Sequence, residues 1–345
     1  DAGTDSGLDA APDVITDAGS DATAEAAPDA GAGADAATVV LAADVTDGVL
    51  ALDDTNVYFT TSNGAGVSGV PKTGGPTFVV AQPTGGLQGG IGALHLHLES
   101  GILYWDAEST LVSVPAAARN VPATIIGDFG LVAFDFAVVG STAYGASDFQ
   151  DVTTLPTTPD AGTHQWLFSN NDTGLWFSFQ LDAENGTLDG LESGNGKIDR
   201  IPLDGGVPTS LNVDPHAVAM AIQEHTMYLL AVPACNDYGA DSGCISTLYS
   251  SLPDGTNPSI VVSELWPFTT NVRGIECIGA ITAKYAFLFI EGGILRVTLA
   301  TGENHVVYSY PATANPAFEQ RGYIAADDDF LYVVDSTAGL VRIAH

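Results

Sequence analysis

Basic residues are scarce in this sequence. Nine Lys and Arg stand against 42 Asp and Glu, which gives a formal net charge of −33 at pH 7, and no basic residue precedes Lys72. A surface with this charge repels nucleic-acid phosphates and anionic lipid headgroups. The composition therefore excludes nucleic-acid binding and electrostatic membrane docking as default functions, whereas binding of cations such as Ca²⁺ remains compatible with it.

Long apolar runs are also lacking. No stretch reaches the about 18 uninterrupted apolar residues that a membrane-spanning helix requires, and no signal peptide is recognisable at the start. The sequence begins at Asp1 rather than at a Met. We therefore interpret it as a mature, processed chain and expect no transmembrane segment.

Cysteine is rare. Of the three cysteines, Cys235 and Cys244 bracket a short polar segment that contains Gly, whereas Cys277 is distant in sequence. Such a loop can bring two thiols within disulfide reach, and no Cys or His spacing suits a zinc site. We predict a disulfide between Cys235 and Cys244, with three reduced buried thiols as the alternative. A disulfide implies an oxidising, extracytoplasmic location.

Catalytic motifs are missing as well. The sequence contains no Gly-x-Ser-x-Gly, no phosphate-binding Gly loop, no His-Glu-x-x-His and no cysteine placed like a nucleophile. The sequence thus predicts a protein that is not an enzyme and that needs no cofactor.

Residues 1–36 differ in composition from the rest of the chain. They consist almost entirely of Asp, Ala, Gly, Thr, Ser and Pro, a composition typical of a disordered tether. Acidic residues recur at every fourth position: Asp1, Asp5, Asp9, Asp13, Asp17, Asp21, Glu25 and Asp29. In an extended strand this period places a row of carboxylates on one face, and 36 residues can reach roughly 120 Å. We expect this acidic tail to contact neighbouring copies of the chain.

The remainder, residues 37–345, contains a repeat of short strands. The whole chain has 46% hydrophobic residues and 39 Gly, a composition typical of an all-β fold. A short apolar strand, as in Leu111 to Val114, recurs and ends at positions 71, 115, 202, 253, 298 and 344. The intervals are 44, 87, 51, 45 and 46, and one aromatic strand, at Tyr144, lies within the long interval. We interpret the long interval as one repeat that carries an insertion at about residues 150–195.

Repeats of this length with four short strands are typical of a β-propeller. The sequence predicts six blades; seven would require that residues 166–179 form a blade of their own. The last repeat lacks a fourth strand, and the matching strand lies at the start of the folded part: Thr38, Val39, Val40, Leu41 and Ala42. We expect this strand to close the ring, so that neither terminus leaves a free sheet edge.

Two motifs carry a family resemblance. Tyr104-Trp105-Asp106, and Gly196 to Arg200 followed by Leu203-Asp204-Gly205, resemble the YWTD type of six-bladed β-propeller and its bacterial TolB-like relatives. The Asp, Ala and Gly-rich start is similar to the spacers of bacterial envelope lipoproteins. This resemblance implies a binding or scaffolding surface rather than a particular activity.

Few residues suggest a site. His95 and His97 alternate on one strand, so both rings point to one face; we treat them as a weak metal-binding candidate beside a structural pair. The acidic runs at Asp53 and Asp327 lie between the first and second strands of their repeats. In that place Asp favours a tight turn over a metal site.

The aromatic segment around residues 166–179 is the most distinctive part of the repeat region. We predict a hairpin in which residues 169–174 form the turn and the aromatic side chains either cover the ring as a lid or contact a partner. These side chains belong to Trp166, Phe168, Trp176 and Phe177. Asn171 and Asn185 match glycosylation sequons, so a glycan is a further expected partner.

These observations favour a secreted or surface-located structural protein. In this interpretation the acidic tail builds a homo-oligomeric extracellular assembly, such as a filament, and the propeller serves as its rigid body. The alternatives are an envelope propeller that binds a glycan or Ca²⁺, and a propeller hydrolase or lyase, which requires His and carboxylates to converge at the channel mouth.

Overall fold

The folded part of the chain consists of short strands joined by turns. A computed structural model describes residues 37–45, 48–61, 66–82, 95–107, 109–130, 135–146, 151–159, 163–169, 176–182, 185–192, 196–232, 246–265, 278–290, 293–310 and 324–345. Within these ranges there are strands and turns but no helix. Accordingly, no helix among these residues has the length and apolar character needed to cross a membrane.

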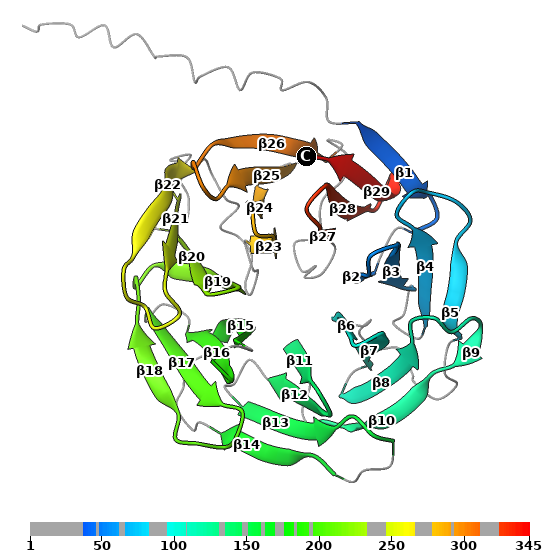
Figure 1. Cartoon of the computed structure of the whole chain (residues 1–345), viewed down its shortest axis with the longest axis horizontal. Coiled ribbons are helices and arrows are strands. Elements are labelled where there is room, and N and C mark those ends of the chain that lie inside the picture. The colour runs from blue at the N-terminus through cyan, green and yellow to red at the C-terminus, as the bar shows by residue number, and fades with distance from the viewer. Residues whose placement is uncertain are drawn as a thin grey trace, which may run out of the picture. The chain divides into compact units, whose positions relative to one another are not determined.

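The strands form seven sheets arranged as a ring (Figure 1). We number the sheets as blades in chain order. Blade 1 contains β2 (Leu50–Leu52), β3 (Asn56–Thr60), β4 (Val67–Pro71), β5 (Phe78–Gln82) and β9 (Val121–Pro122). Blade 2 contains β6 (Leu96–Glu99), β7 (Ile102–Ala107), β8 (Thr110–Pro115) and β10 (Thr124–Asp128). Blade 3 contains β11 (Asp135–Val139), β12 (Thr142–Ala146), β13 (Asp151–Pro156) and β14 (Gln165–Ser169).

The other four blades follow the same order from the innermost to the outermost strand. Blade 4 contains β15 (Trp176–Asp182), β16 (Thr187–Glu192), β17 (Lys197–Pro202) and β18 (Thr209–Asn212). Blade 5 contains β19 (Ala217–Gln223), β20 (Thr226–Ala231), β21 (Ser246–Ser251) and β22 (Ser259–Leu265). Blade 6 contains β23 (Ile278–Ile281), β24 (Tyr285–Ile290), β25 (Gly293–Thr298) and β26 (Asn304–Ser309). Blade 7 contains β27 (Ile324–Ala326), β28 (Phe330–Asp335), β29 (Gly339–Ala344) and β1 (Thr38–Ala42).

The ring is closed by the strand that the sequence predicts for this role. β1 pairs antiparallel with β29, with Thr38 opposite Ile343 and Val40 opposite Val341. Blade 7 therefore combines the first described strand of the chain with its last three strands. The fold is therefore an all-β propeller. Residues Ala34–His345 form one compact unit.

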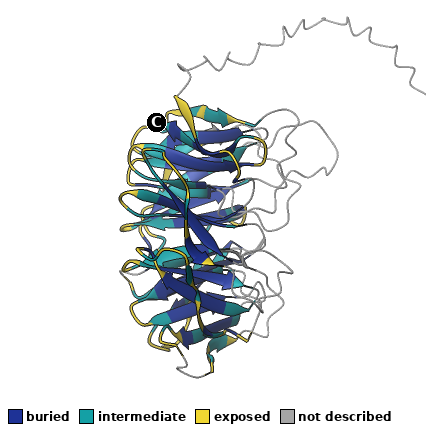
Figure 2. Ribbon diagram, turned by 90° about the vertical axis from the view of Figure 1, so that its right-hand side faces the viewer, coloured by how far each residue is buried: buried dark blue, intermediate teal, exposed yellow. Residues whose placement is uncertain are grey.

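The hydrophobic core consists of seven layers, one between each pair of neighbouring blades. Because side chains alternate along a strand, each blade contributes to the layers on both of its faces. On β12, for example, Ala143 packs in the layer toward blade 2, whereas Tyr144 packs in the layer toward blade 4. Figure 2 shows that the buried residues lie mainly within the strands and that the exposed ones lie mainly in turns and outer strands. Each blade thus needs two neighbours, which a closed ring supplies.

The prediction of six blades is wrong, because the long interval of the repeat contains two blades. Residues 150–195 are not an insertion: β13 and β14 complete blade 3, and β15 and β16 begin blade 4. Residues 166–179 do not form a hairpin or a blade of their own either. β14 pairs with β13, whereas β15 pairs with β16 in the next sheet.

Candidate functional site

The two predicted histidines lie at the innermost strand of blade 2. His95 directly precedes β6 and His97 is its second residue. Both imidazole rings meet the ring of Phe136 on β11 edge to face, with centroid distances of 6.2 Å for His95 and 6.3 Å for His97. The alternation along this strand thus places both rings against blade 3, so the pair bridges two blades.

Two carboxylates flank the His95 imidazole. Nδ1 lies 4.0 Å from Asp106 Oδ1 on β7, and Nε2 lies 3.6 Å from Asp135 Oδ1 on β11. The backbone N–H of His95 also donates to Asp106 Oδ1 at 2.9 Å. The exposed side-chain fractions are 14% for His95, 2% for Asp106 and 16% for Asp135. We call His95, Asp106 and Asp135 the histidine cluster.

The histidine cluster combines an imidazole with carboxylates from two blades. One carboxylate approaches Nδ1 from the same blade, and the other approaches Nε2 from the next blade. The sequence pointed to His95 but missed both partners. Asp106 lies on the neighbouring strand of the same blade, whereas the approach of Asp135 depends on how blades 2 and 3 pack.

The structure gives no support for a metal at His95 and His97. In the part of the chain that is described, no group of three or more His, Cys, Asp or Glu side chains is placed to hold a metal ion. Burial lowers the pKa of His97, and its Nε2 atom has no hydrogen-bond partner. His97 is thus a largely neutral ring packed on Phe136.

The acidic residues at Asp53 and Asp327 form tight turns. Asp53 Oδ1 accepts hydrogen bonds from the backbone N–H groups of Thr55 at 2.7 Å and Asn56 at 2.6 Å. The Tyr58 hydroxyl donates to Asp53 Oδ2 at 2.6 Å. Burial opposes ionisation of this carboxyl, but the hydrogen bonds from Tyr58, Thr55 and Asn56 outweigh burial and lower the pKa of Asp53 to about 2. Asp327 repeats the arrangement with the backbone of Phe330 and the hydroxyl of Tyr332.

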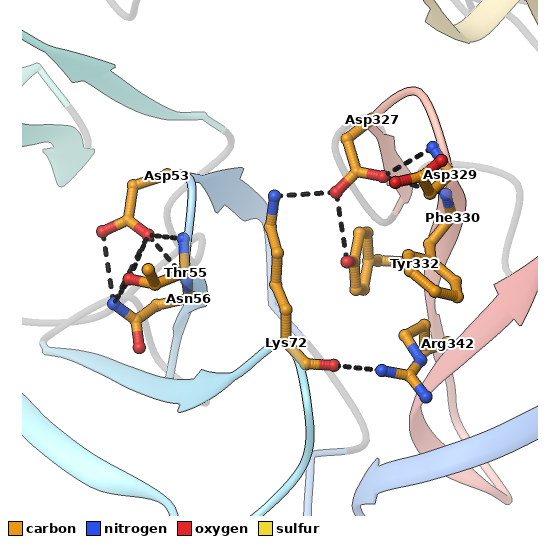
Figure 3. A network of polar contacts seen from close by, with 9 residues as sticks. All are labelled: Asp53, Thr55, Asn56, Lys72, Asp327, Asp329, Phe330, Tyr332 and Arg342. Carbon is orange, nitrogen blue, oxygen red and sulfur yellow. Dashed lines mark hydrogen bonds and ion pairs between the residues drawn. The ribbon is translucent and has the colours of Figure 1, made fainter.

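Lys72 contacts Asp327 and Arg342 across the boundary between blades 7 and 1, which we call the closing seam (Figure 3). Its ammonium group donates to Asp327 Oδ2 at 2.7 Å, and its carbonyl oxygen accepts a hydrogen bond from the Arg342 guanidinium on β29. The two Lys72 contacts connect the first and last blades.

A second polar network lies in blade 4. Arg200 on β17 binds the buried carboxylate of Asp189 on β16 at 2.8 Å, and it also donates to the carbonyl oxygen of Pro253 in blade 5. Lys197 lies 2.9 Å from Glu192 and 2.9 Å from Asp199. These contacts bind blade 4 internally and to its neighbour.

Every described Lys or Arg makes a contact within the ring. Arg119 lies over the ring of Phe78 at 3.9 Å, Arg296 lies over that of Tyr285 at 4.7 Å, and Lys284 lies 4.0 Å from Asp328. Lys72, Lys197, Arg200 and Arg342 have the partners given above. In the described ranges no cluster of free cations is available to an anionic partner.

The residues predicted to contact a partner lie in two different blades. Trp166 on β14 is 55% exposed, and Phe168 on the same strand is half-buried. Trp176 and Phe177 lie on β15, where only the backbone is described. The predicted acidic tail, the sequon at Asn171 and the cysteines Cys235, Cys244 and Cys277 all lie outside the described residues.

Comparisons with known proteins support the β-propeller fold but do not identify a family or a function. No family model and no curated protein matches the chain. Among solved structures, it is similar to the β-propeller domain of Cps50 (Swd1) from Myceliophteria thermophila, with a TM-score of 0.61, 8% identity and coverage of 90% of this chain and 100% of the other. It is also similar to a catalytically inactive variant of virginiamycin B lyase from Staphylococcus aureus, solved with quinupristin (TM-score 0.54, 11% identity, coverage 90% and 99%). YCF48 bound to the D1 peptide matches with a TM-score of 0.56, 9% identity and coverage of 90% and 95%. At these identities the likeness establishes a β-propeller and no function.

Proposed function

We propose that this chain is a non-enzymatic structural protein outside the cell or on its outer surface. The propeller is the rigid body, and the acidic tail, residues 1–36, contacts neighbouring copies and builds an extracellular assembly such as a filament. The observation that carries the proposal is the position of β1. β1 is the outermost strand of blade 7, so the tail joins the propeller at an outer strand rather than at an inner one.

The distribution of charge indicates that the acidic tail does not bind to a basic patch in the described part of a neighbouring copy. The tail contributes carboxylates at every fourth position, whereas every described Lys and Arg is already engaged within the ring. Contacts of the tail with the described part of the ring therefore rest on backbone hydrogen bonds and apolar side chains, or on cations from solution that bridge carboxylates. Such an assembly becomes more stable as salt or Ca²⁺ screens the carboxylates.

Sedimentation velocity of the full chain tests this proposal. We expect species larger than the 35.4 kDa chain, and we expect a synthetic peptide of residues 1–36 in excess to dissociate them by competition. A peptide of the same composition in scrambled order is the matched control. A single 35.4 kDa species at every concentration and salt level would overturn the proposal.

The histidine cluster favours a second candidate, an envelope propeller that binds a ligand or acts as a hydrolase or lyase. Such chemistry requires a histidine and carboxylates that converge, and the observation that supports the candidate is that Asp106 on β7 and Asp135 on β11 each lie within 4.0 Å of the His95 imidazole. The virginiamycin B lyase among the similar structures shares the propeller architecture only. Calorimetric titration with Ca²⁺ and with sugars, on the chain and on its His95→Asn variant, tests this candidate. Heat that disappears in the variant supports it, and the absence of heat in both counts against it.

A further inference from the structure

The outer edge of blade 3 is prepared for an additional strand. β14 pairs with β13 along one edge, and no described strand pairs with its other edge. Its sequence, Gln-Trp-Leu-Phe-Ser, contains no Asp, Glu, Lys or Arg, a property that it shares with the outermost strands β1, β18 and β26. Exposed edges are normally protected by charges, prolines or bulges, because they otherwise accept a strand from another chain. β14 has neither a charge nor a proline, and its register with β13 shifts between Trp166 and Phe168. In a chain with 42 acidic residues, an uncharged edge is a surface that does not repel an acidic partner.

An exposed tryptophan, Trp166, distinguishes β14 from the other outermost strands. Blades 2, 5, 6 and 7 expose aliphatic side chains there: Ile125, Ile260, Val306, Val39 and Val40. Blade 3 exposes an indole, which meets His164 edge to face with a centroid distance of 5.9 Å. His164 is in turn placed by the Asp128 carbonyl oxygen, 3.2 Å from Nδ1. Trp166 is therefore supported on one side and open on the other, as expected of an aromatic interface anchor.

Blade 1 shows that an outer edge of this ring accepts a fifth strand. β9 pairs in parallel with β5, with Val121 opposite Ala81 and Pro122 opposite Gln82. This strand comes from the region between β8 and β10 and adds outside the fourth strand of the blade. Strand addition at the outer edge is therefore compatible with the curvature and twist of these blades.

The tail contains one segment suited to strand addition. Residues 14–16, Val-Ile-Thr, are the only consecutive β-branched residues between positions 1 and 36, and β-branched residues favour strands. The 21 residues between Thr16 and Thr38 span up to roughly 70 Å when extended. This length lets the segment reach beyond its own outer edge to a neighbouring ring.

Resting on the proposed function, we propose that residues 14–16 of one copy add as a fifth strand to β14 of a neighbouring copy, with Trp166 as the anchor. Main-chain hydrogen bonds along β14 supply affinity, and alternate side chains of the segment pack beside the indole. Asp13 and Asp17 flank the segment, and in a centred register they lie opposite the ends of β14, Gln165 and Ser169, which carry no charge. The partner is a second copy of this chain, so the contact is head to tail and propagates.

Photo-crosslinking of the full chain tests the docking site. Unlabelled chains that carry p-benzoylphenylalanine in place of Ile15 are mixed with ¹⁵N-labelled chains, and crosslinked peptides are mapped by mass spectrometry. We expect crosslinks from position 15 to labelled peptides that contain Trp166. Crosslinks to labelled peptides elsewhere would retain the tail-mediated assembly but overturn β14 as its site. Crosslinks confined to one chain, or none, would overturn both.

Substitutions of two similarly exposed residues on different outermost strands test the docking site by a second measurement, the strength of self-association. Trp166 and Ile260 are 55% and 59% exposed on the outermost strands of blades 3 and 5, so neither substitution removes a buried group. Trp166→Asp is expected to weaken self-association at least about tenfold, whereas Ile260→Asp changes it less than about twofold. Thermal melts of both variants confirm that the ring is intact. Equal losses in the two variants, or no loss in Trp166→Asp, would overturn the assignment of β14.

Discussion

Arg200 and Asp189 lie opposite each other on β17 and β16, and the guanidinium holds the buried carboxylate through two nitrogens at 2.8 and 3.1 Å. Asp189 is the third residue of the second strand of blade 4. In the other six blades this position is aromatic: Tyr58, Tyr104, Tyr144, Tyr228, Phe287 and Tyr332. Blade 4 therefore has an ion pair where the others have an aromatic ring.

Removing one partner of this pair is expected to be costly. Arg200→Leu leaves the Asp189 carboxylate buried without its cation, and breaking a buried pair in this way costs about 3–5 kcal/mol. The double variant Asp189→Leu with Arg200→Leu removes both charges and should lose clearly less. Chemical denaturation of the three proteins measures the difference. The exposed pair of Lys284 and Asp328 is the control, since Lys284→Gln should cost about 0–1 kcal/mol. Similar losses in Arg200→Leu and Lys284→Gln would contradict this account.

Asp53 should make the fold sensitive to acid. Its pKa in the folded protein is about 2 against an ordinary value of 3.8, so it stabilises the fold above about pH 4. This contribution is lost as pH falls from about 4 toward 2, because the unfolded chain then takes up the proton more readily. Asp53→Asn should therefore be less stable than the parent at pH 7 and closer to it at pH 2.5. Denaturation midpoints at the two pH values check this; a constant difference between the proteins would contradict it.

His345 should add a second pH dependence nearer neutrality. Its ring lies 4.9 Å from that of Tyr285 and 5.0 Å from that of Phe287, between blades 7 and 6. Burial lowers the pKa of His345 from its ordinary value of 6.5, and the nearby Arg296 acts in the same direction, whereas Asp327 opposes both. The contribution of neutral His345 to stability is thus fully present above about pH 6.5. It declines below that pH, because the unfolded state binds the proton better.

His345→Phe keeps the ring packing and removes this titration. Between pH 7 and pH 5, its melting temperature should fall less than that of the parent chain. Parallel slopes for the two proteins would show that His345 does not contribute.

Lys72 should stabilise the closing seam without affecting assembly. Lys72→Gln removes the cation from Asp327, and for a partly buried pair we expect a loss of about 1–2 kcal/mol in the free energy of unfolding. Self-association should remain within about twofold of the parent, in contrast to Trp166→Asp. Unfolding curves and sedimentation on the same samples check both parts. A variant that unfolds like the parent would show that the seam does not depend on this ion pair.

The sequence predicted the propeller architecture and the closing strand but miscounted the blades. The count relied on an aromatic second strand in each repeat, and Asp189 removed that signal from blade 4. A second signal was present, since Val152 to Pro156 (Val-Thr-Thr-Leu-Pro) matches the third-strand pattern. Its end at position 156 divides the interval from 115 to 202 into 41 and 46 residues, each the length of one blade.

The candidate site was predictable only in part. Alternation along one strand was sufficient to place His95 and His97 on one face. The sequence did not identify the partners of His95. Asp106 lies on the neighbouring strand β7, and Asp135 lies on β11 of the next blade. Contacts between blades depend on the number of blades and their twist, which the repeat pattern does not specify.

Electron microscopy of the full chain under conditions of self-association tests the central claim most directly. The account predicts repeating propellers in which density for residues 1–36 of each ring continues onto the outer edge of the next. Isolated rings, or assemblies in which those residues contact no second copy, would contradict it.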